Sequence, residues 1–344
     1  MENVTHIAID IAKQSFHLRA VNHRGRAVLD RKLSRNAVLK TVLNFPPGTV
    51  VVMEACGGAH YWARLFRHHG YPTKLLPPHL VKPFVKSQKN DAADAEAIAE
   101  AASRDTMRFV PVKTIEQQGM LALHRVRSRL VKQRTALMNE LRGILLEFGV
   151  VVPQGVKALK ESLRGDSVMS LPEAVLAVVK DLEDELHGVD GRITRYEKAL
   201  RERAKQHELC VRLMTVPGIG VLTATALDAT VGDPRQFRNG RALSAWLGLV
   251  PSQKTTGGRA RLGRITKRGD CYLRQLMVHG ARAVLKVAQR YKESRYSLWA
   301  KHLRDSKGYN KASVALANRN ARIAWALMVK PDAVFSPGGT LTAA

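Results

Sequence analysis

Four acidic residues in the first hundred positions have the types and spacing of a metal site for phosphodiester chemistry. Asp10 closes a stretch of alternating apolar and polar residues, and Glu54 directly follows a continuous apolar run. Asp91 and Asp94 open an alanine-rich helical stretch, where a spacing of three puts both carboxylates on one helix face. Taken singly, each of these acids is more often a helix cap or a surface group.

The combination of these four acids favours a magnesium site over four unrelated surface groups. Carboxylates that share a small volume repel one another, which raises their pKa values or pushes them apart. Mg²⁺ removes this repulsion because it prefers hard oxygen ligands and completes its octahedron with phosphate oxygens. Two such ions about 4 Å apart are the usual clamp for cutting and joining phosphodiester bonds. We therefore expect Asp10, Glu54, Asp91 and Asp94 to be catalytic and to bind Mg²⁺.

The elements that must position these acids read as an RNase H-like α/β domain. Alternating patterns and turn residues predict three antiparallel strands, a helix, a buried strand, a helix, a short strand and a final helix. In order, they span Val4–Asp10, Ser15–Val21, Ala27–Leu33, Asn36–Leu43, Thr49–Met53, His60–His69, Pro72–Leu76 and Asp91–Ala102. The first and fourth strands of such a sheet lie side by side, so their ends should present Asp10 and Glu54 together.

The remainder of the chain is predicted to be mainly helical. Two long helices, Ile115–Phe148 and Pro172–Gln206, are separated by a polar stretch and suggest a coiled-coil linker, either a dimerisation arm or a spacer. We predict helices at Cys271–Tyr291 and Ala312–Val329, with a glycine-rich basic loop at Thr255–Gly269 between the two halves of the C-terminal part. The predicted domains are residues 1–110, 111–208 and 209–335.

Two smaller features of the C-terminal part are a glycine-containing turn and three tryptophans. Val216–Gly220 is either the phosphate-binding turn of a helix–hairpin–helix module or a plain turn between helices. Trp246, Trp299 and Trp325 fall on apolar faces, which predicts that they belong to the core.

Composition points to a nucleic-acid partner. Lys and Arg number 56 against 29 Asp and Glu, a formal net charge of +27, and 45% of residues are hydrophobic, which excludes a disordered chain. A generic basic surface or a ribosomal protein would share the charge but would not need the carboxylates. Three scattered cysteines, with no CxxC pair and no Cys/His cluster of zinc spacing, predict a reducing cytoplasm. The lack of an apparent signal peptide and of an apolar run of membrane-spanning length predicts no membrane association. We expect a cytoplasmic, nucleoid-associated bacterial protein.

The charge is concentrated in residues 251–310, which hold 15 Lys and Arg against three acidic residues. The glycine-rich loop in this region lets the backbone approach phosphate closely, and its cations would position a nucleic-acid backbone without reading sequence. A solvated basic face is the simpler alternative. The nucleic-acid-binding candidates are Lys254, Arg259, Arg261, Arg264, Lys267 and Arg268.

Seven motifs, in order along nearly the whole chain, resemble the DEDD-type insertion-sequence transposases, which are relatives of the Piv DNA invertases. They are Ile7–Lys13 (IAIDIAK), Met53–Gly57 (MEACG), Lys89–Ala95 (KNDAADA), Pro217–Gly220 (PGIG), Trp246–Pro251 (WLGLVP), Gly257–Gly258 (GG) and Arg261–Asp270 (RLGRITKRGD). The resemblance implies a RuvC-like N-terminal domain, a coiled-coil linker, a second catalytic domain, and Mg²⁺ held by Asp10, Glu54, Asp91 and Asp94. It further implies donor and target double-stranded DNA as substrates and a structured noncoding RNA as guide. Composite sites in a homodimer or homotetramer are also implied.

The second catalytic element departs from the family pattern. The family carries Ser-Ser-Gly after the Gly-Leu-x-Pro turn, and a serine of that element attacks DNA covalently, whereas this chain has Thr255-Thr256-Gly257. A threonine hydroxyl can be a nucleophile, although its methyl group crowds the attack on phosphorus. We predict Thr256 as the catalytic nucleophile, with Thr255 and Ser252 as alternatives.

The sequence leaves three functions open. The first is a transposase that exchanges DNA strands with a hydroxyl nucleophile, with Mg²⁺ and under RNA guidance. The second is a nuclease resembling Holliday-junction resolvases, in which the acids direct water and the C-terminal domain only binds. The third is an inactive transposase kept as a DNA-binding regulator, or a catalytically inert copy that the threonine pair has impaired. A covalent protein–DNA intermediate separates the first from the second, and Mg²⁺-dependent cleavage separates both from the third.

Overall fold

A computed structural model of the chain describes residues 4–86, 90–287, 295–336 and 341–343. Contacts divide the chain into two units, residues 1–115 with 231–236 and residues 116–230 with 237–344. The predicted linker therefore shares a unit with the C-terminal residues, while the division at 110 and 208 stays a prediction. Among the described residues, no helix is both long and apolar enough to cross a membrane.

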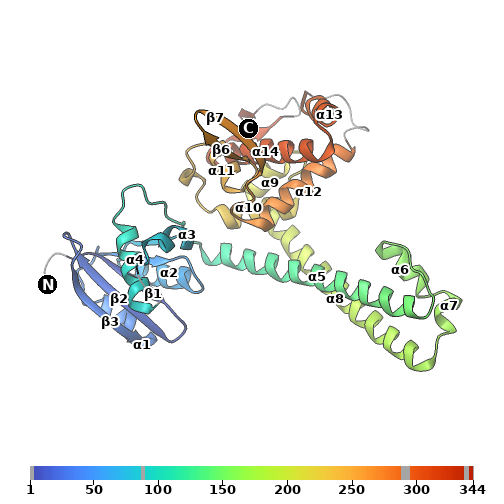
Figure 1. The fold of residues 1–344 in the computed structure, drawn as a ribbon, viewed down its shortest axis with the longest axis horizontal. Helices are drawn as coiled ribbons and strands as arrows, with labels where there is room; N and C mark the ends of the chain where they lie inside the picture. Colours follow the sequence, from blue (N-terminus) through green and yellow to red (C-terminus); the bar gives the residue numbers. More distant parts are fainter. Residues whose placement is uncertain (1–3, 87–89, 288–294, 337–340, 344) are drawn as a thin grey trace. The chain divides into compact units, whose positions relative to one another are not determined.

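A five-stranded mixed sheet forms the centre of the N-terminal unit (Figure 1). The strand order is β3-β2-β1-β4-β5, with antiparallel pairing among the first three strands and parallel pairing of β4 with both β1 and β5. The first and fourth strands are neighbours, as expected from the sequence. The strands span Val4–Ile11 (β1), Ser15–Asn22 (β2), Ala27–Ser34 (β3), Val50–Glu54 (β4) and Thr73–Leu76 (β5).

Helices cover both faces of this sheet, and alternation along the strands decides which side chains meet them. Ile7 and Ile9 point into one core together with side chains of α1 and α2, while Ala8 points into the other core with side chains of α4. The helices are Arg35–Val42 (α1), Ala59–His68 (α2), Pro78–Val81 (α3), Lys82–Phe84 (η1, a 3-10 turn) and Asp91–Ala102 (α4). The predicted motif residue Lys89 lies outside the described residues.

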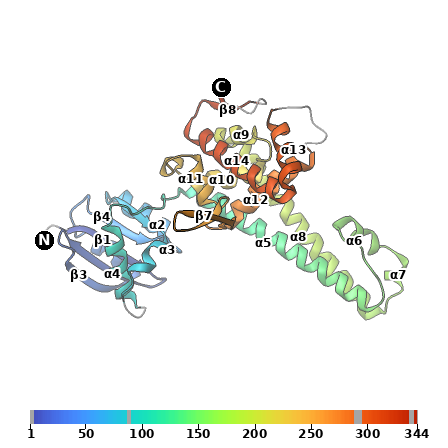
Figure 2. The same cartoon turned by 45° about the horizontal axis from the view of Figure 1, so that its top comes forward.

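A long helical hairpin follows. Figures 1 and 2 show α5 (Ile115–Glu147) and α8 (Glu173–Gln206) side by side, joined through the short helices α6 (Val156–Ser162) and α7 (Asp166–Met169). One apolar stripe from each long helix builds the shared core. Its buried residues include Leu137, Leu141, Leu186, Val189 and Ile193. Both long helices match their predicted ranges within about a residue.

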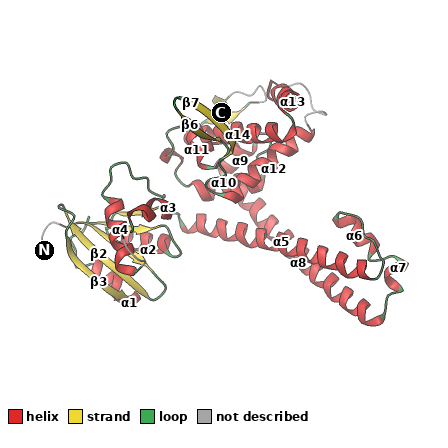
Figure 3. Ribbon diagram, viewed as in Figure 1, coloured by secondary structure: helices red, strands yellow, loops and turns green. Residues whose placement is uncertain are grey.

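The C-terminal part is mainly helical (Figure 3). Its helices are Glu208–Met214 (α9), Val221–Val231 (α10), Pro234–Gln236 (η2), Gly240–Trp246 (α11), Cys271–Val287 (α12), Arg295–Lys307 (α13) and Tyr309–Val329 (α14), and two short strands, Ala333–Phe335 (β8) and Leu341–Ala343 (β9), pair near the end. The predicted end of α12 at Tyr291 falls outside the described residues.

The turn Val216–Gly220 joins α9 to α10 and is held by contacts with α12, α13 and α14. Gly218 has a φ of +90°, and its carbonyl oxygen lies so close to Gly280 on α12 that a Cβ there would stand 1.8 Å from it. The side chains of Asn320 and Tyr296 both donate to the carbonyl of Pro217, at 2.8 and 3.2 Å. This segment is thus a tight helix–helix turn, while a phosphate-binding role for it stays a prediction.

The predicted glycine-rich loop is instead a β-hairpin, which corrects the sequence interpretation. Strand β6 (Pro251–Thr256) pairs antiparallel with β7 (Arg259–Ile265) across a two-residue turn. Gly257 and Gly258 have φ angles of +56° and +76°, as a type I′ hairpin turn requires. Two adjacent glycines are typical of such a turn. The strands on either side were not predicted because their many basic residues lack a clear alternation of apolar and polar positions.

The three C-terminal tryptophans are also placed differently from the prediction. Trp246, Trp299 and Trp325 are all only partly buried, so none is a true core residue. Tryptophan is large, and one edge of its ring commonly stays accessible even when the rest packs.

Candidate active site and nucleic-acid interface

Strand register brings Asp10 and Glu54 to the same level of the sheet. Ile9 pairs with Met53 across the parallel strands β1 and β4, so the next residue on each strand is one of the two acids. Neighbouring strands lie about 4.8 Å apart. Both acids follow a residue of the α1/α2 core, so alternation turns them to the opposite face, which α4 covers.

Helix α4 carries the other two acids toward the same face. Asn90 caps the helix by accepting a hydrogen bond from the backbone N–H of Ala93 at 2.8 Å, which fixes where the helix begins. Asp94 lies one turn before Ile98, a fully buried residue of the core between α4 and the sheet. Asp91 lies one turn further toward the helix start. The spacing of three therefore puts both carboxylates on one face of α4, with Asp94 partly buried and Asp91 exposed at the helix start.

Electrostatics at this edge of the sheet show that the acids act on one another. Burial raises the pKa of Asp10, and the negative charges of Asp94 and Asp91 raise it further. The Cys56 thiol lies near the same acids but was not predicted to belong to this site. Burial raises its pKa, and the charges of Glu54 and Asp10 raise it further. Only its position two residues after Glu54 could have indicated this.

This donor set fits a divalent cation. The acids share a partly buried edge where ionised Asp10 is disfavoured, and a bound cation would reverse that cost. Within the described residues, no three of the four place one oxygen each within 4.8 Å of one another. Asp91 lies 3.7 Å from the ammonium of Lys32 on β3, an exposed and therefore weak ion pair.

The predicted nucleophile Thr256 ends β6 directly before the hairpin turn. Cross-strand partners in an antiparallel pair point to the same face, and successive residues alternate between the faces. Thr256 pairs with Arg259, and Lys254 pairs with Arg261, so these four side chains share one face of the hairpin. All four are exposed. The structure thus sets one hydroxyl beside three of the predicted nucleic-acid-binding cations.

The two alternative hydroxyls have different surroundings. Thr255 lies on the opposite face, beside Leu262 and Gln253, and its Oγ1 accepts a hydrogen bond from Gln253 Nε2 at 2.8 Å. The Oγ of Ser252 is packed against Gly263, where an added Cβ would come within 2.6 Å of it. Thr256 is therefore the hydroxyl with the most basic and most open surroundings of the three.

The base of the hairpin is anchored by close backbone contacts. An added Cβ at Gly269 would lie 1.9 Å from the carbonyl oxygen of Trp246, and one at Gly248 would lie 2.4 Å from that of Arg268. Arg274 on α12 donates to the carbonyls of Leu247 and Arg268, at 3.1 and 2.9 Å. The exposed strands thus extend from a rigid base.

The remaining predicted cations lie around this base rather than on the face of Thr256. Arg264 and Lys267 line a pocket between the hairpin and α14, and Arg268 is exposed at the anchored segment. The six basic candidates are therefore divided between one face of the hairpin and its base.

A second group of possible metal ligands lies elsewhere. Within the described residues, His207, Cys210 and Asp228 place one ligand atom each within 4.8 Å of one another. The sequence showed no zinc spacing because Asp228 comes from another helix, α10. Burial and the neighbouring Asp228 raise the pKa of the Cys210 thiol to about 12.

Two family models match the two regions that hold these residues. A family of DEDD transposases of the IS110 type matches residues 7–149, and the Transposase IS116/IS110/IS902 family matches residues 210–297. The first match contains the four acids, and the second contains the hairpin. Both confirm the family resemblance predicted from the motifs.

Individual relatives match over almost the full chain. A probable family 20 transposase of Pseudomonas aeruginosa is 46% identical over 98% of this chain and the whole of that protein. The transposase for insertion sequence element IS1111A of Coxiella burnetii is 45% identical over 96% of this chain and 92% of that protein. The transposase for insertion sequence element IS1328 of Yersinia enterocolitica is 39% identical over 98% of this chain and the whole of that protein. The chain therefore belongs to the IS116/IS110/IS902 family of transposases.

Proposed function

We propose that this transposase exchanges DNA strands with two catalytic elements, a magnesium-binding RNase H-like domain and a threonine on the β6–β7 hairpin. The observation that carries the first element is the strand register that sets Asp10 beside Glu54, on the sheet face that α4 covers. A sheet order of β3-β2-β1-β4-β5 with helices on both faces supports the RNase H-like, and more narrowly RuvC-like, assignment.

In this proposal Asp10, Glu54, Asp91 and Asp94 hold Mg²⁺. The bound ion would act as a Lewis acid on phosphate oxygens. The acids themselves fix where the cation stands, because Asp10 and Glu54 are rooted in buried strands and Asp94 in the packed side of α4. A divalent ion is consistent with the DEDD family, and Mg²⁺ is our specific assignment.

Thr256 supplies the nucleophile. Its Oγ1 would form a bond to phosphorus while its proton passes to water. The bond from phosphorus to a sugar oxygen would break with its electron pair on that oxygen, which would take up a proton from water and leave as a hydroxyl. Lys254, Arg259 and Arg261 on the same hairpin face would hold the phosphate and offset its developing charge. Their shared face is the observation that favours Thr256 over Thr255.

The partners follow from the charge and the family. Transposases act on DNA, and we propose double-stranded donor and target DNA, a structured noncoding RNA as guide, and a homodimer or homotetramer as the active form. The net charge of +27 supports binding of polyanions in general. Exposed apolar side chains on the loop that ends α5, Phe148 and Val151, support self-association.

The test is a strand-transfer assay with purified protein, Mg²⁺, both DNA substrates and RNA transcribed from the flanking element. Denaturing gels would detect DNA linked covalently to protein. We expect the wild type and Thr256→Ser to form an adduct, while Thr256→Ala and Asp10→Ala do not. Thr255→Ala is the matched control, because it removes a hydroxyl from the other hairpin face and should keep the adduct.

Two outcomes would overturn the assignment. Cleavage that needs Asp10 but ignores Thr256 and leaves no adduct would make the protein a metal-dependent nuclease that uses water, like a junction resolvase. DNA binding without any Mg²⁺-dependent cleavage, with RNA supplied, would indicate a DNA-binding regulator that has lost catalysis.

A further inference from the structure

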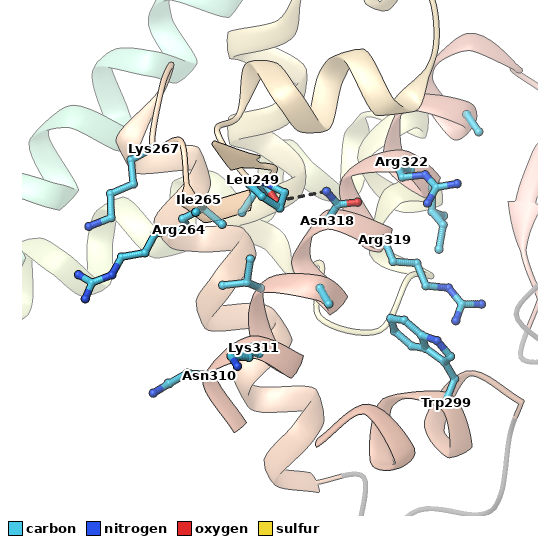
Figure 4. Close-up of a pocket in the computed structure, with 16 residues that line it drawn as sticks. Leu249, Arg264, Ile265, Lys267, Trp299, Asn310, Lys311, Asn318, Arg319 and Arg322 are labelled. Carbon is cyan, nitrogen blue, oxygen red and sulfur yellow. Dashed lines mark hydrogen bonds between the residues drawn. The ribbon is translucent and has the colours of Figure 1, made fainter. Parts of the chain in front are cut away.

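A large pocket lies between the base of the β6–β7 hairpin and the helices α13 and α14. Its volume is about 1260 Å³, above the range of roughly 300–1,000 Å³ typical of sites for single small molecules. Apolar side chains from the hairpin and α14, including Ile265, Val314 and Ile323, form part of its lining, and Trp299 of α13 stands at one end (Figure 4). The pocket therefore offers apolar surface on a scale that suits several linked groups.

Five cations line the same pocket. Arg264 and Lys267 come from the hairpin and its base, and Lys311, Arg319 and Arg322 come from α14. The lining residues include no Asp or Glu. In the parts of the chain that the structure describes, none of the five forms a salt bridge with an acidic residue. Five uncompensated positive charges call for an anionic occupant.

A cation–π contact between Arg319 and Trp299 stands in one wall of the pocket, backed by the buried ring of Tyr296. The guanidinium of Arg319 lies 4.6 Å from the centroid of the Trp299 ring and 5.2 Å from that of Tyr296. In Figure 4 the Arg319 side chain extends from α14 toward the Trp299 ring. Tyr296 is fixed by hydrogen bonds to Asn320 and to the carbonyl of Pro217. Flat groups of this kind, aromatic rings and guanidinium planes, are the surfaces on which unpaired bases stack.

We propose that this pocket binds a short single-stranded segment of nucleic acid, with a base stacked at Trp299 and Arg319 and phosphates on Arg264, Lys267 and Lys311. Cations beside an aromatic surface are the combination that single-strand-binding grooves use. A duplex would engage the cations alone, because its base faces are covered by neighbouring bases. This inference rests on the proposed function, since it names how the C-terminal part holds its substrate.

The position of the pocket gives the segment a role in the reaction. Five residue steps of β6 separate Pro251, which lines the pocket, from Thr256 near the turn. At a strand rise of about 3.3 Å per residue this is roughly 17 Å. A strand held in the pocket would thus be unpaired a few nucleotides from the bond that Thr256 attacks. The pocket would keep the opened strand from re-annealing.

The test measures binding without Mg²⁺, so it does not depend on catalysis. Fluorescein-labelled 12-mers of dT and of rU, and a DNA duplex, would be titrated with the full-length protein at several salt concentrations. We expect Trp299→Leu to weaken binding of the single strands by roughly 5- to 150-fold, the range for loss of one stacked base, and to change duplex binding by less than about twofold. The dT and rU arms show whether the preferred strand is DNA or RNA.

Intrinsic fluorescence provides a second readout at the same residue. Single strands should quench part of the tryptophan emission of the wild type, and this part should be missing in Trp299→Phe. Trp325→Phe is the matched control, because Trp325 lies on α14 and does not line this pocket, and it should keep the quench. Lys311→Ala should lower the salt dependence of single-strand binding more than Lys301→Ala, which removes an exposed lysine of α13 outside the pocket.

Unchanged single-strand affinity and quenching in folded Trp299→Leu and Trp299→Phe would overturn the proposal. The proposal would also be overturned if Trp299→Leu changed the oligomeric state of the protein but left its affinity for single strands unchanged. The pocket would then be an interface between copies of the chain. Thr256→Ala separates this inference from the proposed reaction, because it should lose the covalent adduct and keep single-strand binding.

Discussion

The proposed metal binding requires Asp10 to be ionised, whereas folding of the metal-free protein favours its protonated form. Asp10 is rooted in a strand whose preceding three residues are fully buried, and it faces Asp94 and Asp91. Burial and these two charges raise its pKa, so the ionised form that a cation needs is the form that the fold resists. Such opposition is common at active sites, where function is maintained at some cost in stability.

Replacing Asp10 with asparagine should therefore stabilise the metal-free protein while abolishing activity. The pKa of Asp10 is higher in the folded protein than in the unfolded chain. Stability is therefore lost as the pH rises from the unfolded-state pKa through the folded-state pKa. At neutral pH, the ionised Asp10 destabilises the fold. Thermal unfolding at pH 7 with a chelator should give a higher Tm for Asp10→Asn than for the wild type. A lower Tm would contradict this account. Asp30→Asn is the control, because Asp30 pairs with His17 and Arg19 and its replacement should not raise the Tm.

At the scale of elements, one buried histidine joins three helices. His124 on α5 is 2% exposed, with Nδ1 3.0 Å from the hydroxyl of Tyr272 on α12 and Nε2 3.0 Å from Oγ1 of Thr225 on α10. Burial, and then the charge of Arg127, lower its pKa to about 4. At neutral pH it is a neutral ring that satisfies two hydroxyls inside a helix junction.

Acid should loosen this junction. The unfolded chain takes up a proton on His124 near pH 6.5 and the folded protein only near pH 4, so stability is full above 6.5 and falls between these values. The loss is at most about 3 kcal/mol. Urea unfolding at pH 7.5 and pH 5 should show a smaller pH effect in His124→Gln than in the wild type. Equal pH effects in the two proteins would count against this role.

The contact between Gly218 and Gly280 sets how closely the α9–α10 turn approaches α12. A Cβ on Gly280 would lie 1.8 Å from a backbone oxygen that cannot move aside. Gly280→Ala should lower the free energy of unfolding by roughly 1–3 kcal/mol. Gly188→Ala is the matched control, because Gly188 is exposed in α8 with nothing within 4 Å of an added Cβ. It should raise that free energy by up to about 1 kcal/mol, since alanine favours helix.

The elements that sequence could predict are those with a long or regular pattern. The N-terminal strands and both hairpin helices have clear periods, and Pro172 marks the start of α8 as its N-cap. Strand adjacency then placed Asp10 and Glu54 together. Helix α13 was not predicted because its sequence is polar and lacks an apolar repeat. Strands β6 and β7 were not predicted because all their residues are exposed except Ile265 at the end of β7, so they have no buried face to give an apolar pattern.

The pocket at Trp299 could not have been predicted from sequence patterns. Its cations come from the hairpin base and from α14, which are more than forty residues apart, and its aromatic wall comes from a third element. Periodicity assigns a residue to a face of its own element but not to a neighbour. The sequence pattern therefore predicted Trp299 to be a core residue, whereas its ring lines the pocket.

At the scale of the whole molecule, several exposed apolar residues lie close together along the chain where the helical hairpin turns back. Leu146 at the end of α5 is 58% exposed, and Phe148, Val151 and Met169, in the segment that connects α5 to α8, are 46%, 77% and 67% exposed. Exposed apolar groups in such number are typical of surfaces that bind another protein. A second copy of the chain is the partner that the proposed homo-oligomer supplies.

We predict that Phe148→Ser with Val151→Ser weakens self-association at least about tenfold, a change of roughly 1.4 kcal/mol. Light scattering after size-exclusion chromatography, over a range of protein concentrations, would measure it. Ile115→Ser is the control, because Ile115 is 69% exposed at the other end of α5. Equal masses for the double variant and the wild type would exclude this surface from the oligomer.

The anchored hairpin also affects how the protein can change over generations. The strand side chains from Gln253 to Thr256 and from Arg259 to Leu262 are exposed, while Gly248 and Gly269 hold the base through backbone contacts that no side chain tolerates. Variation at these exposed positions meets few folding constraints, so selection there acts mainly on chemistry and substrate. A lineage could exchange serine for threonine, or redistribute its cations, without passing through an unfolded intermediate. The hairpin strands can therefore change more freely than the glycine-held base from which they extend.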